Sequence, residues 1–395
     1  MTARVLGVGM VPFATPRTAR PYDELARVAI RSALSDAGIL LEDVQQAYAG
    51  YVYGDSTSGQ QALYGVGRTG IPVVNVNNNC STGSTALWLA RQAVASGVAE
   101  CVLAFGFEQM ERGALTEKWT DRPNPLGAFI RAAEEVEAGA RAPLAPMLFG
   151  GAGADYAARY EMDPAVFARI SVKSRAHAAN NPNAVFTDPV TVDEVLASPR
   201  VFGPLTRLQC CPPTCGAAAA VIVSPEFARR RGLTADVEIA GQALRTDTDT
   251  TFEGGDRMRV VGYDVTVAAA AAAYEEAGIG GEEFGVVELH DCFTTNELIS
   301  YEALGLTPPG TAERFILDGD NTYGGRVVTN PSGGLLSKGH PLGATGLAQC
   351  AELVWQLRGQ AGARQVHGVR TALQHNIGLG GAAVVTVYRT VDALS

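Results

Sequence analysis

Helical and strand-like hydrophobic patterns alternate along the first part of the chain. Apolar residues recur at helical spacing over residues 22–39, and a β-like segment follows at 44–54. Strand-like runs at 72–76 and 100–108 flank a helix-like segment at 84–98. An alternation of strands and helices predicts a parallel, layered α/β domain.

The second part of the chain repeats this theme. A strand-like run at 284–291 leads to a helix at 294–306, and a helix at 345–359 precedes two closing strands. The segments "NVNNNCSTGSTAL" and "NPSGGLLSKGHPLGATG" each run from an asparagine, through a turn with one reactive side chain, into a helix of small residues. Enrichment in Gly and Ala can produce such an echo by chance. We predict two similar halves, residues 1–234 and 235–395.

Residues 113–200 interrupt the alternation. They are richer in Pro, Asn and isolated charges than the flanking segments. We predict an inserted loop-and-helix region within the first half, placed as a lid over a site.

The overall charge excludes some classes of partner. The formal net charge is -10, which disfavours generic binding to nucleic acid or to anionic membranes. The apolar runs are too short to cross a bilayer, and neither a signal peptide nor a peroxisomal address is present. The 7 cysteines are scattered and odd in number, which indicates reduced thiols and a cytoplasmic protein.

Cys80 is the first candidate for chemistry, because it directly precedes a predicted helix start at Ser81 and Thr82. A helix N-terminus favours negative charge, and lowering the thiol pKa by about one or two units, at about 1.4 kcal/mol each, would make the thiolate substantial near neutrality. The alternative is a buried, inert cysteine.

His290 and Cys292 form the second candidate pair. The strand-like run "VVEL" delivers them to a strand end, and residues two apart on a strand share a face. The carboxyl ends of strands are where open α/β sheets bind ligands. Equally, His290 could only satisfy a backbone carbonyl, and Cys292 could be a core residue.

Two glycine-rich segments supply further candidates. Gly339 and Pro341 hold His340 in a tight turn ahead of a helix, without the spacing of a phosphate-binding or dinucleotide-binding loop. The segment "QHNIGLGGA" offers Asn376 and the backbone amides around Gly378, although it could be no more than a strand with a bulge.

The remaining cysteines and histidines receive no chemical role. No second Cys or His pair at ligand spacing accompanies the "CCPPTC" segment, so we predict no metal site. We expect structural roles for the remaining cysteines, which are Cys101, Cys210, Cys211, Cys215 and Cys350. We expect His177 and His367 to lie in polar or surface-like contexts without partners.

Taken together, "NNNCSTGSTAL", "ELHDCFTTNEL", "NPSGGLLSKGHPLGATG" and "LQHNIGLGGAAVV" closely resemble the thiolase superfamily, in the branch of the sterol carrier protein X thiolases. The His-Asp-Cys-Phe motif at residues 290–293 is specific for that branch. Other thiolases carry a Cys-x-Gly motif where this chain has Asn376-Ile377-Gly378, and in the resembled branch Cys292 supplies the missing thiol. The chain ends soon after this region, so we expect no fused lipid-carrier domain.

The resemblance implies a fold and an activity. The fold would be two similar βαβαβαββ halves in a five-layer αβαβα arrangement with an inserted loop domain. The activity would be that of an acyl-CoA:acetyl-CoA or propionyl-CoA acyltransferase, which cleaves 3-oxoacyl-CoA with coenzyme A in fatty acid or sterol side-chain degradation. Coenzyme A would be a co-substrate with no permanently bound cofactor, and the protein would be a homodimer or homotetramer.

The resemblance also assigns roles to the candidate residues. Cys80 would be the nucleophile, His340 would take its proton, and Cys292 would act first as acid and then as base. His290 and His340 would donate hydrogen bonds to the thioester oxygen. The amides of Cys80 and Gly378 would form a second oxyanion hole, with Asn376 in a supporting position.

Two other functions are compatible with the same residues. A decarboxylating ketosynthase also uses one cysteine and two histidines, which Cys80, His290 and His340 match, but it needs no thiol at Cys292. A catalytically silent acyl-CoA-binding subunit would stabilise a partner enzyme, and the four reactive side chains argue against it.

Overall fold

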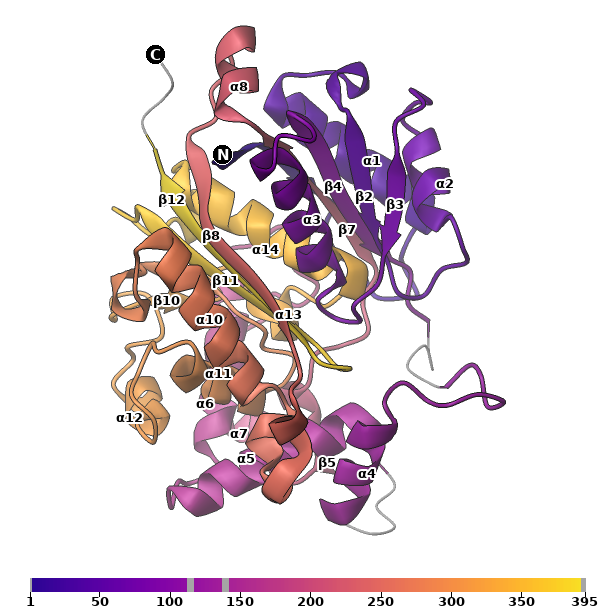
Figure 1. Ribbon diagram of the computed structural model, residues 1–395. Helices are drawn as coiled ribbons and strands as arrows, with labels where there is room; N and C mark the ends of the chain where they lie inside the picture. Colours follow the sequence, from indigo (N-terminus) through magenta and orange to yellow (C-terminus); the bar gives the residue numbers. More distant parts are fainter. Residues whose placement is uncertain (1, 112–116, 137–141, 392–395) are drawn as a thin grey trace.

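One large mixed β-sheet runs through both halves of the chain (Figure 1). The computed structural model describes residues 2–111, 117–136 and 142–391. Within these residues the sheet has ten strands in the order β10-β9-β11-β12-β8-β1-β7-β4-β2-β3. Their bounds are β1 Ala3–Met10, β2 Gln46–Gly50, β3 Val73–Val76, β4 Cys101–Glu108, β7 Gly216–Val223, β8 Val237–Thr246, β9 Val286–Glu288, β10 Val328–Thr329, β11 Thr371–Gly378 and β12 Ala382–Thr390.

The strand order is the same in both halves. When β1, β2, β3, β4 and β7 are numbered one to five, they run 3-2-4-5-1 across the sheet, and so do β8 to β12. The two first strands, β1 and β8, pair antiparallel where the halves meet. The repeated order confirms that the chain consists of two similar halves.

The parallel sheet expected from the alternation is only partly present. β2 runs parallel to β3 and β4, and β9 runs parallel to β10 and β11. β7 and β12 are antiparallel to both of their neighbours. β12 follows β11 through a tight turn at Gly380 and Gly381, which leaves no room for the crossover helix that a parallel pair requires.

Helices cover both faces of the sheet and fill its centre. α1 packs on the outer side of β1 and β7, and α10 packs on β8 and β12. α14 contacts β4 and β7 of the first half as well as β9 and β11 of the second, so it lies with α3 between the two groups of strands. The result is the expected αβαβα arrangement. These helices are α1 Tyr22–Ala37, α2 Ser58–Tyr64, α3 Thr82–Ala95, α10 Tyr263–Ala277, α11 Thr294–Ala303 and α14 Leu342–Leu357.

The first turns of α3 and α14 touch through glycine. A Cβ atom on Gly346 would lie 2.1 Å from Ser84 Oγ, and one on Gly83 would lie 2.7 Å from the Gly343 carbonyl oxygen. Such distances exclude any side chain larger than hydrogen. The residues directly ahead of the two helices are therefore brought to one place.

The segment between β4 and β7 packs on the second half of the chain. Phe149 stacks on Phe293 with ring centroids 5.0 Å apart, and Lys173 forms a buried ion pair with Glu297. Residues 113–116 and 137–141 of the expected insertion lie outside the described residues. The described elements are α4 Gly127–Val136, α5 Leu144–Arg159, α6 Val166–Ala178, α7 Val192–Ala197, β5 Arg200–Phe202 and β6 Leu205–Thr206.

None of the described helices is long and apolar enough to span a membrane. Short elements complete the described chain. The short elements are α8 Pro225–Arg231, α9 Arg257–Val260, α12 Ala312–Leu317, α13 Gly334–Ser337, and the 3₁₀ helices η1 Leu41–Asp43, η2 Arg207–Gln209, η3 Asp249–Gly255, η4 Gly281–Glu283 and η5 Gly362–Arg364.

We predict that Gly346→Ala separates α3 from α14. The added methyl group would overlap Ser84, so the free energy of unfolding should fall by about 1–3 kcal/mol, measured by urea denaturation. Gly127→Ala is the matched control, because its Cβ would meet only the end of the Arg131 side chain at 3.6 Å. Equal stability of the two variants would contradict the close helix contact.

Candidate active site

Cys80 lies in the loop between β3 and α3, at the carboxyl end of the parallel strands. Asn79 adopts the left-handed conformation, with φ 51°, and its side-chain amide donates to the Leu379 carbonyl at 3.1 Å. The Ser81 hydroxyl donates to the Asn78 carbonyl at 2.8 Å. These bonds fix the turn that presents the Cys80 side chain ahead of the helix.

His290 and His340 arrive from two other elements. His290 follows the carboxyl end of β9, and the next residue, Asp291, accepts backbone hydrogen bonds from Leu335 at 2.7 Å and from Leu336 at 3.3 Å. His340 lies in the turn before α14, where its backbone N–H donates to the Thr214 hydroxyl. Both loops are thus held by buried hydrogen bonds.

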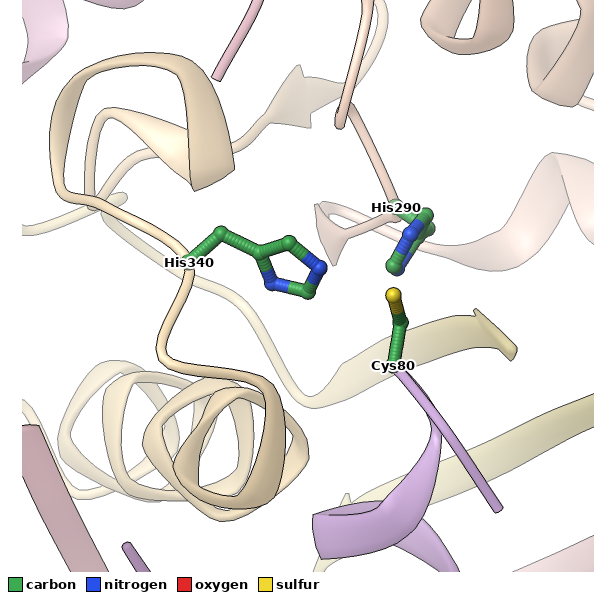
Figure 2. Close-up of side chains that lie close together, drawn as sticks. All are labelled: Cys80, His290 and His340. Atoms are coloured by element: carbon green, nitrogen blue, oxygen red, sulfur yellow. The ribbon is translucent and has the colours of Figure 1, made fainter. Parts of the chain in front are cut away.

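The structure brings Cys80, His290 and His340 together (Figure 2). The Cys80 sulfur points toward the two imidazoles, and one ligand atom of each residue lies within 4.8 Å of the others. The imidazole centroids are 5.1 Å apart and the rings are nearly perpendicular, at 84°. Among the described residues, this is the group of sulfur and nitrogen atoms whose spacing could suit a metal ion.

A cavity of about 640 Å³ opens over this group. Cys80, His290, Cys292, His340 and Gly378 all line it, so the structure collects the predicted reactive side chains and the predicted amide at one surface. Its walls are mostly apolar and come from the inserted segment and the second half, including Phe129, Leu144, Phe149, Val260 and Ile377. Described residues of the inserted segment therefore form part of the cavity wall.

Cys211 is a site residue that the sequence analysis missed. It was expected to be structural, but Cys210 and Cys211 both line the cavity. The Cys211 backbone N–H donates to the Cys292 carbonyl at 2.9 Å, and the neighbouring residues Cys210 and Phe293 form an antiparallel bridge. Cys211 thus lies opposite Cys292 across two extended segments. The "CCPPTC" run is visible in the sequence, but nothing local to it indicates that Cys211 lies opposite Cys292.

The expectation of a Cys80 thiolate near neutral pH is wrong for the free protein. Burial and the nearby Glu108 carboxylate raise the pKa of the Cys80 thiol to about 12. The thiol donates to Asn79 Oδ1 at 3.6 Å. Burial destabilises the thiolate by more than the helix N-terminus stabilises it.

His340 presents a lone pair to the cavity. The Thr345 hydroxyl donates to the Pro341 carbonyl at 3.0 Å, so at 2.7 Å from His340 Nδ1 it accepts the ring proton. Nε2 is buried without a hydrogen-bond partner in the described chain. Burial and Lys338 lower the pKa of His340 to about 3, which leaves a neutral imidazole with a free nitrogen.

His290 is also neutral. Burial, together with His340 and His375, holds its pKa well below the ordinary histidine value. Its Nδ1 atom lies 2.7 Å from the side-chain nitrogen of Asn376. Asn376 therefore contacts the site as a supporting residue, although it is not among the described residues that line the cavity.

The remaining predictions have mixed outcomes. Cys101, Cys215 and Cys350 are buried as expected. His177 was expected in a surface-like context without partners, and this is wrong. It is 3% exposed, and its ring nitrogens bond the Asn330 carbonyl at 3.0 Å and the Thr322 hydroxyl at 2.8 Å, because α6 packs against the second half.

Two family profiles match most of the chain. The profile described as "Thiolase, N-terminal domain" matches residues 5–226, and "Thiolase C-terminal domain-like" matches residues 251–390. The chain belongs to the thiolase family.

The chain is also similar over nearly its whole length to a curated relative and to solved structures. Sterol carrier protein 2 of Rattus norvegicus is 54% identical over 98% of this chain and 71% of the relative. Among solved structures, the Ltp2-ChsH2(DUF35) aldolase has a TM-score of 0.82 at 26% identity and covers 98% of both chains. Human mitochondrial 3-ketoacyl-CoA thiolase shares the fold, with a TM-score of 0.74 at 19% identity over 99% of both chains.

The raised pKa of Cys80 predicts a steep pH dependence of alkylation in this thiolase. Below a pKa of about 12 the thiolate fraction rises about tenfold per pH unit, so iodoacetamide labelling of the Cys80 peptide should rise in that proportion from pH 7 to pH 10. Mass spectrometry of the digested protein gives the rate, and Cys80→Ser identifies the peptide. A rate that levels off near pH 7 would instead support a stable thiolate in the free enzyme.

Proposed function

We propose that this thiolase cleaves 3-oxoacyl-CoA with coenzyme A, as an acyl-CoA:acetyl-CoA or propionyl-CoA acyltransferase. The observation that supports this most directly is the neutral Cys80 thiol beside the unpartnered Nε2 of His340. A second thiol, Cys292, lines the same cavity. A nucleophile, a base and a further acid are the groups that cleavage next to a ketone requires.

In the first half-reaction, the Cys80 sulfur attacks the ketone carbon while its proton passes to His340 Nε2. The bond between this carbon and the α-carbon of the thioester then breaks, and the electron pair moves to the thioester oxygen as an enolate. His290 and the newly protonated His340 donate hydrogen bonds to that oxygen, and Cys292 protonates the enolate carbon. Each such donor typically lowers the barrier by about 3 kcal/mol.

In the second half-reaction, the Cys292 thiolate takes the proton of coenzyme A. The coenzyme A sulfur attacks the acyl group on Cys80, the Cys80 sulfur leaves and takes its proton back from His340 Nε2, and the acyl-CoA product departs. Burial and Cys211 keep the pKa of Cys292 well above the ordinary thiol value, so its resting form is the proton donor that the first half-reaction needs. The retained acyl group implies ping-pong kinetics.

The high pKa of Cys80 bears on the timing of the first step. A preformed ion pair of thiolate and imidazolium is disfavoured, because both ions would be desolvated. Proton transfer therefore accompanies attack on the ketone carbon, where the amides of Cys80 and Gly378 stabilise the developing oxyanion. Gly378 is suited to this position, because a Cβ there would lie 2.1 Å from the Asn78 carbonyl oxygen.

The apolar cavity supports a lipid acyl group as substrate. Aliphatic and aromatic walls favour a fatty acyl or sterol side chain over a polar one. We place the reaction in the degradation of such chains, without a resident cofactor. All 7 cysteines are free thiols, which supports a reducing, cytoplasmic setting.

An acyl-enzyme trapping experiment tests the proposal. Without coenzyme A, the wild type should release one equivalent of acetyl-CoA or propionyl-CoA from a 3-oxoacyl-CoA panel and retain the acyl mass on the Cys80 peptide. Cys80→Ser should retain none, with thiolysis reduced by at least about 10³-fold. Cys215→Ser is a matched control, because that buried cysteine is not among the described cavity residues. Full thiolysis by Cys80→Ser would overturn the proposal.

A second candidate function is retro-aldol cleavage, which the likeness to the Ltp2-ChsH2(DUF35) aldolase favours. That reaction releases a carbonyl product from a 3-hydroxyacyl-CoA and needs no acyl-enzyme. If the wild type and Cys80→Ser both cleave 3-hydroxyacyl-CoA while neither forms an acyl-enzyme, the aldolase assignment replaces thiolysis. Consumption of a malonyl donor would instead indicate a condensing enzyme.

We further propose a homodimer or homotetramer, with β3 at a subunit interface. Among the described strands β3 pairs only with β2, and Val74 on it is 46% exposed. An unpaired edge can add a strand from another subunit. Val74→Lys should therefore shift the molar mass from a multiple of 41.3 kDa toward that value, measured by light scattering. Val98→Lys, at another exposed apolar residue, should leave the mass unchanged.

A further inference from the structure

A chain of buried hydrogen bonds leads away from His290 into the core. Asn376 Nδ2 lies 2.7 Å from His290 Nδ1, and Ser84 Oγ lies 3.0 Å from Asn376 Oδ1. Gln374 Nε2 lies 2.9 Å from Ser84 Oγ and 2.7 Å from the Gly346 carbonyl oxygen. Ser84, Gln374 and Asn376 are each 0% exposed, so bulk water does not compete for these bonds.

The end of this hydrogen-bond series that is farthest from His290 determines which groups donate and which accept. A backbone carbonyl only accepts hydrogen bonds, so the Gln374 atom that faces Gly346 must be the amide nitrogen. The second N–H of Gln374 donates to Ser84 Oγ at 2.9 Å rather than to the more distant Gln349 Oε1 at 3.5 Å, and the Ser84 proton therefore points to Asn376. The Tyr388 hydroxyl donates to the other side of Gln374, at Oε1, which agrees with this orientation.

The same donor and acceptor assignments determine the role of the His290 ring nitrogen. Because Asn376 accepts the Ser84 proton with its oxygen, it turns its nitrogen to His290 and donates there. His290 Nδ1 must then accept, and a neutral imidazole with an accepting Nδ1 carries its proton on Nε2.

We propose that this chain fixes the tautomer of His290, and that Ser84 and Gln374 are positioning residues of the active site. The two facing histidines then differ in a defined way. His340 presents a lone pair on Nε2, held by Thr345, whereas His290 presents an N–H. One histidine can take the Cys80 proton while the other donates to the thioester oxygen. His290 Nε2 would have to lose its proton before it could bind a metal ion beside Cys80.

The catalytic consequence rests on the proposed function, but the tautomer does not. Nitrogen-15 NMR of histidine-labelled protein distinguishes the two tautomers, and His290→Gln assigns the signal. The wild type should show protonated Nε2 and unprotonated Nδ1. Gln374→Glu replaces the donor with a carboxylate that only accepts, so Ser84 and Asn376 should reverse and the proton should move to His290 Nδ1.

Thiolysis then supplies a second readout. Loss of the Nε2 donor should lower kcat of Gln374→Glu by about 10²-fold, with a smaller change in KM. Tyr388→Phe is the matched control, because it removes a buried hydrogen bond of the same chain without reversing any donor. Its tautomer and kcat should stay within about threefold of the wild type.

Ser84→Ala keeps the test decisive if Gln374→Glu does not fold. It breaks the chain without adding charge, so His290 should become a mixture of tautomers and kcat should fall. A wild-type spectrum with the proton on Nδ1, or an unchanged tautomer in the folded variants, would overturn the proposal. If the tautomer switches in the variants but the wild type has no thiolytic activity, the proposal about the hydrogen bonds stands and only the proposed function is overturned.

Discussion

The contact between the first turns of α3 and α14 is the constraint on which the rest of the structure depends. Gly83 and Gly346 have no Cβ, so the two helices approach until backbone meets backbone. Cys80 and His340 lie directly ahead of these turns, and the same approach places Ser84 beside Gly346 and within reach of Gln374 and Asn376. Packing thus sets the distance between Cys80 and His340, and it also positions the hydrogen bonds that connect Ser84 through Asn376 to His290.

Burial gives the site its electrostatic character. Burial shifts the pKa of the Cys80 and Cys292 thiols upward and that of the His290 and His340 imidazoles downward, so each shift favours the neutral form. The Glu108 carboxylate is also buried, and its pKa is raised to about 7 although it accepts three backbone hydrogen bonds, from Val52, Tyr53 and Gly343. Thiols and imidazoles that rest neutral suit the proposed carbon–carbon cleavage, because negative charge on the substrate then develops only as the bond breaks, where fixed donors can stabilise it.

The inserted segment and the "CCPPTC" run show how remote sequence completes the site. Phe149 from the insertion stacks on Phe293, and Thr214 anchors the backbone of His340. Cys211 lies across from Cys292. None of these pairings has a local signal, because the residues that meet are far apart in the chain and the contact depends on how the two halves fold together.

The sequence by itself predicted the alternating elements, the two similar halves and the candidate site residues, because hydrophobic periodicity and short motifs are local properties of the chain. Cys80, His290, Cys292 and His340 could all be named in this way. Only the tertiary structure decided the antiparallel centre of the sheet, the neutral state of Cys80 and the partners of His177 and Cys211. Each of these depends on desolvation or on contacts between distant segments, and neither is encoded in a residue's immediate neighbours.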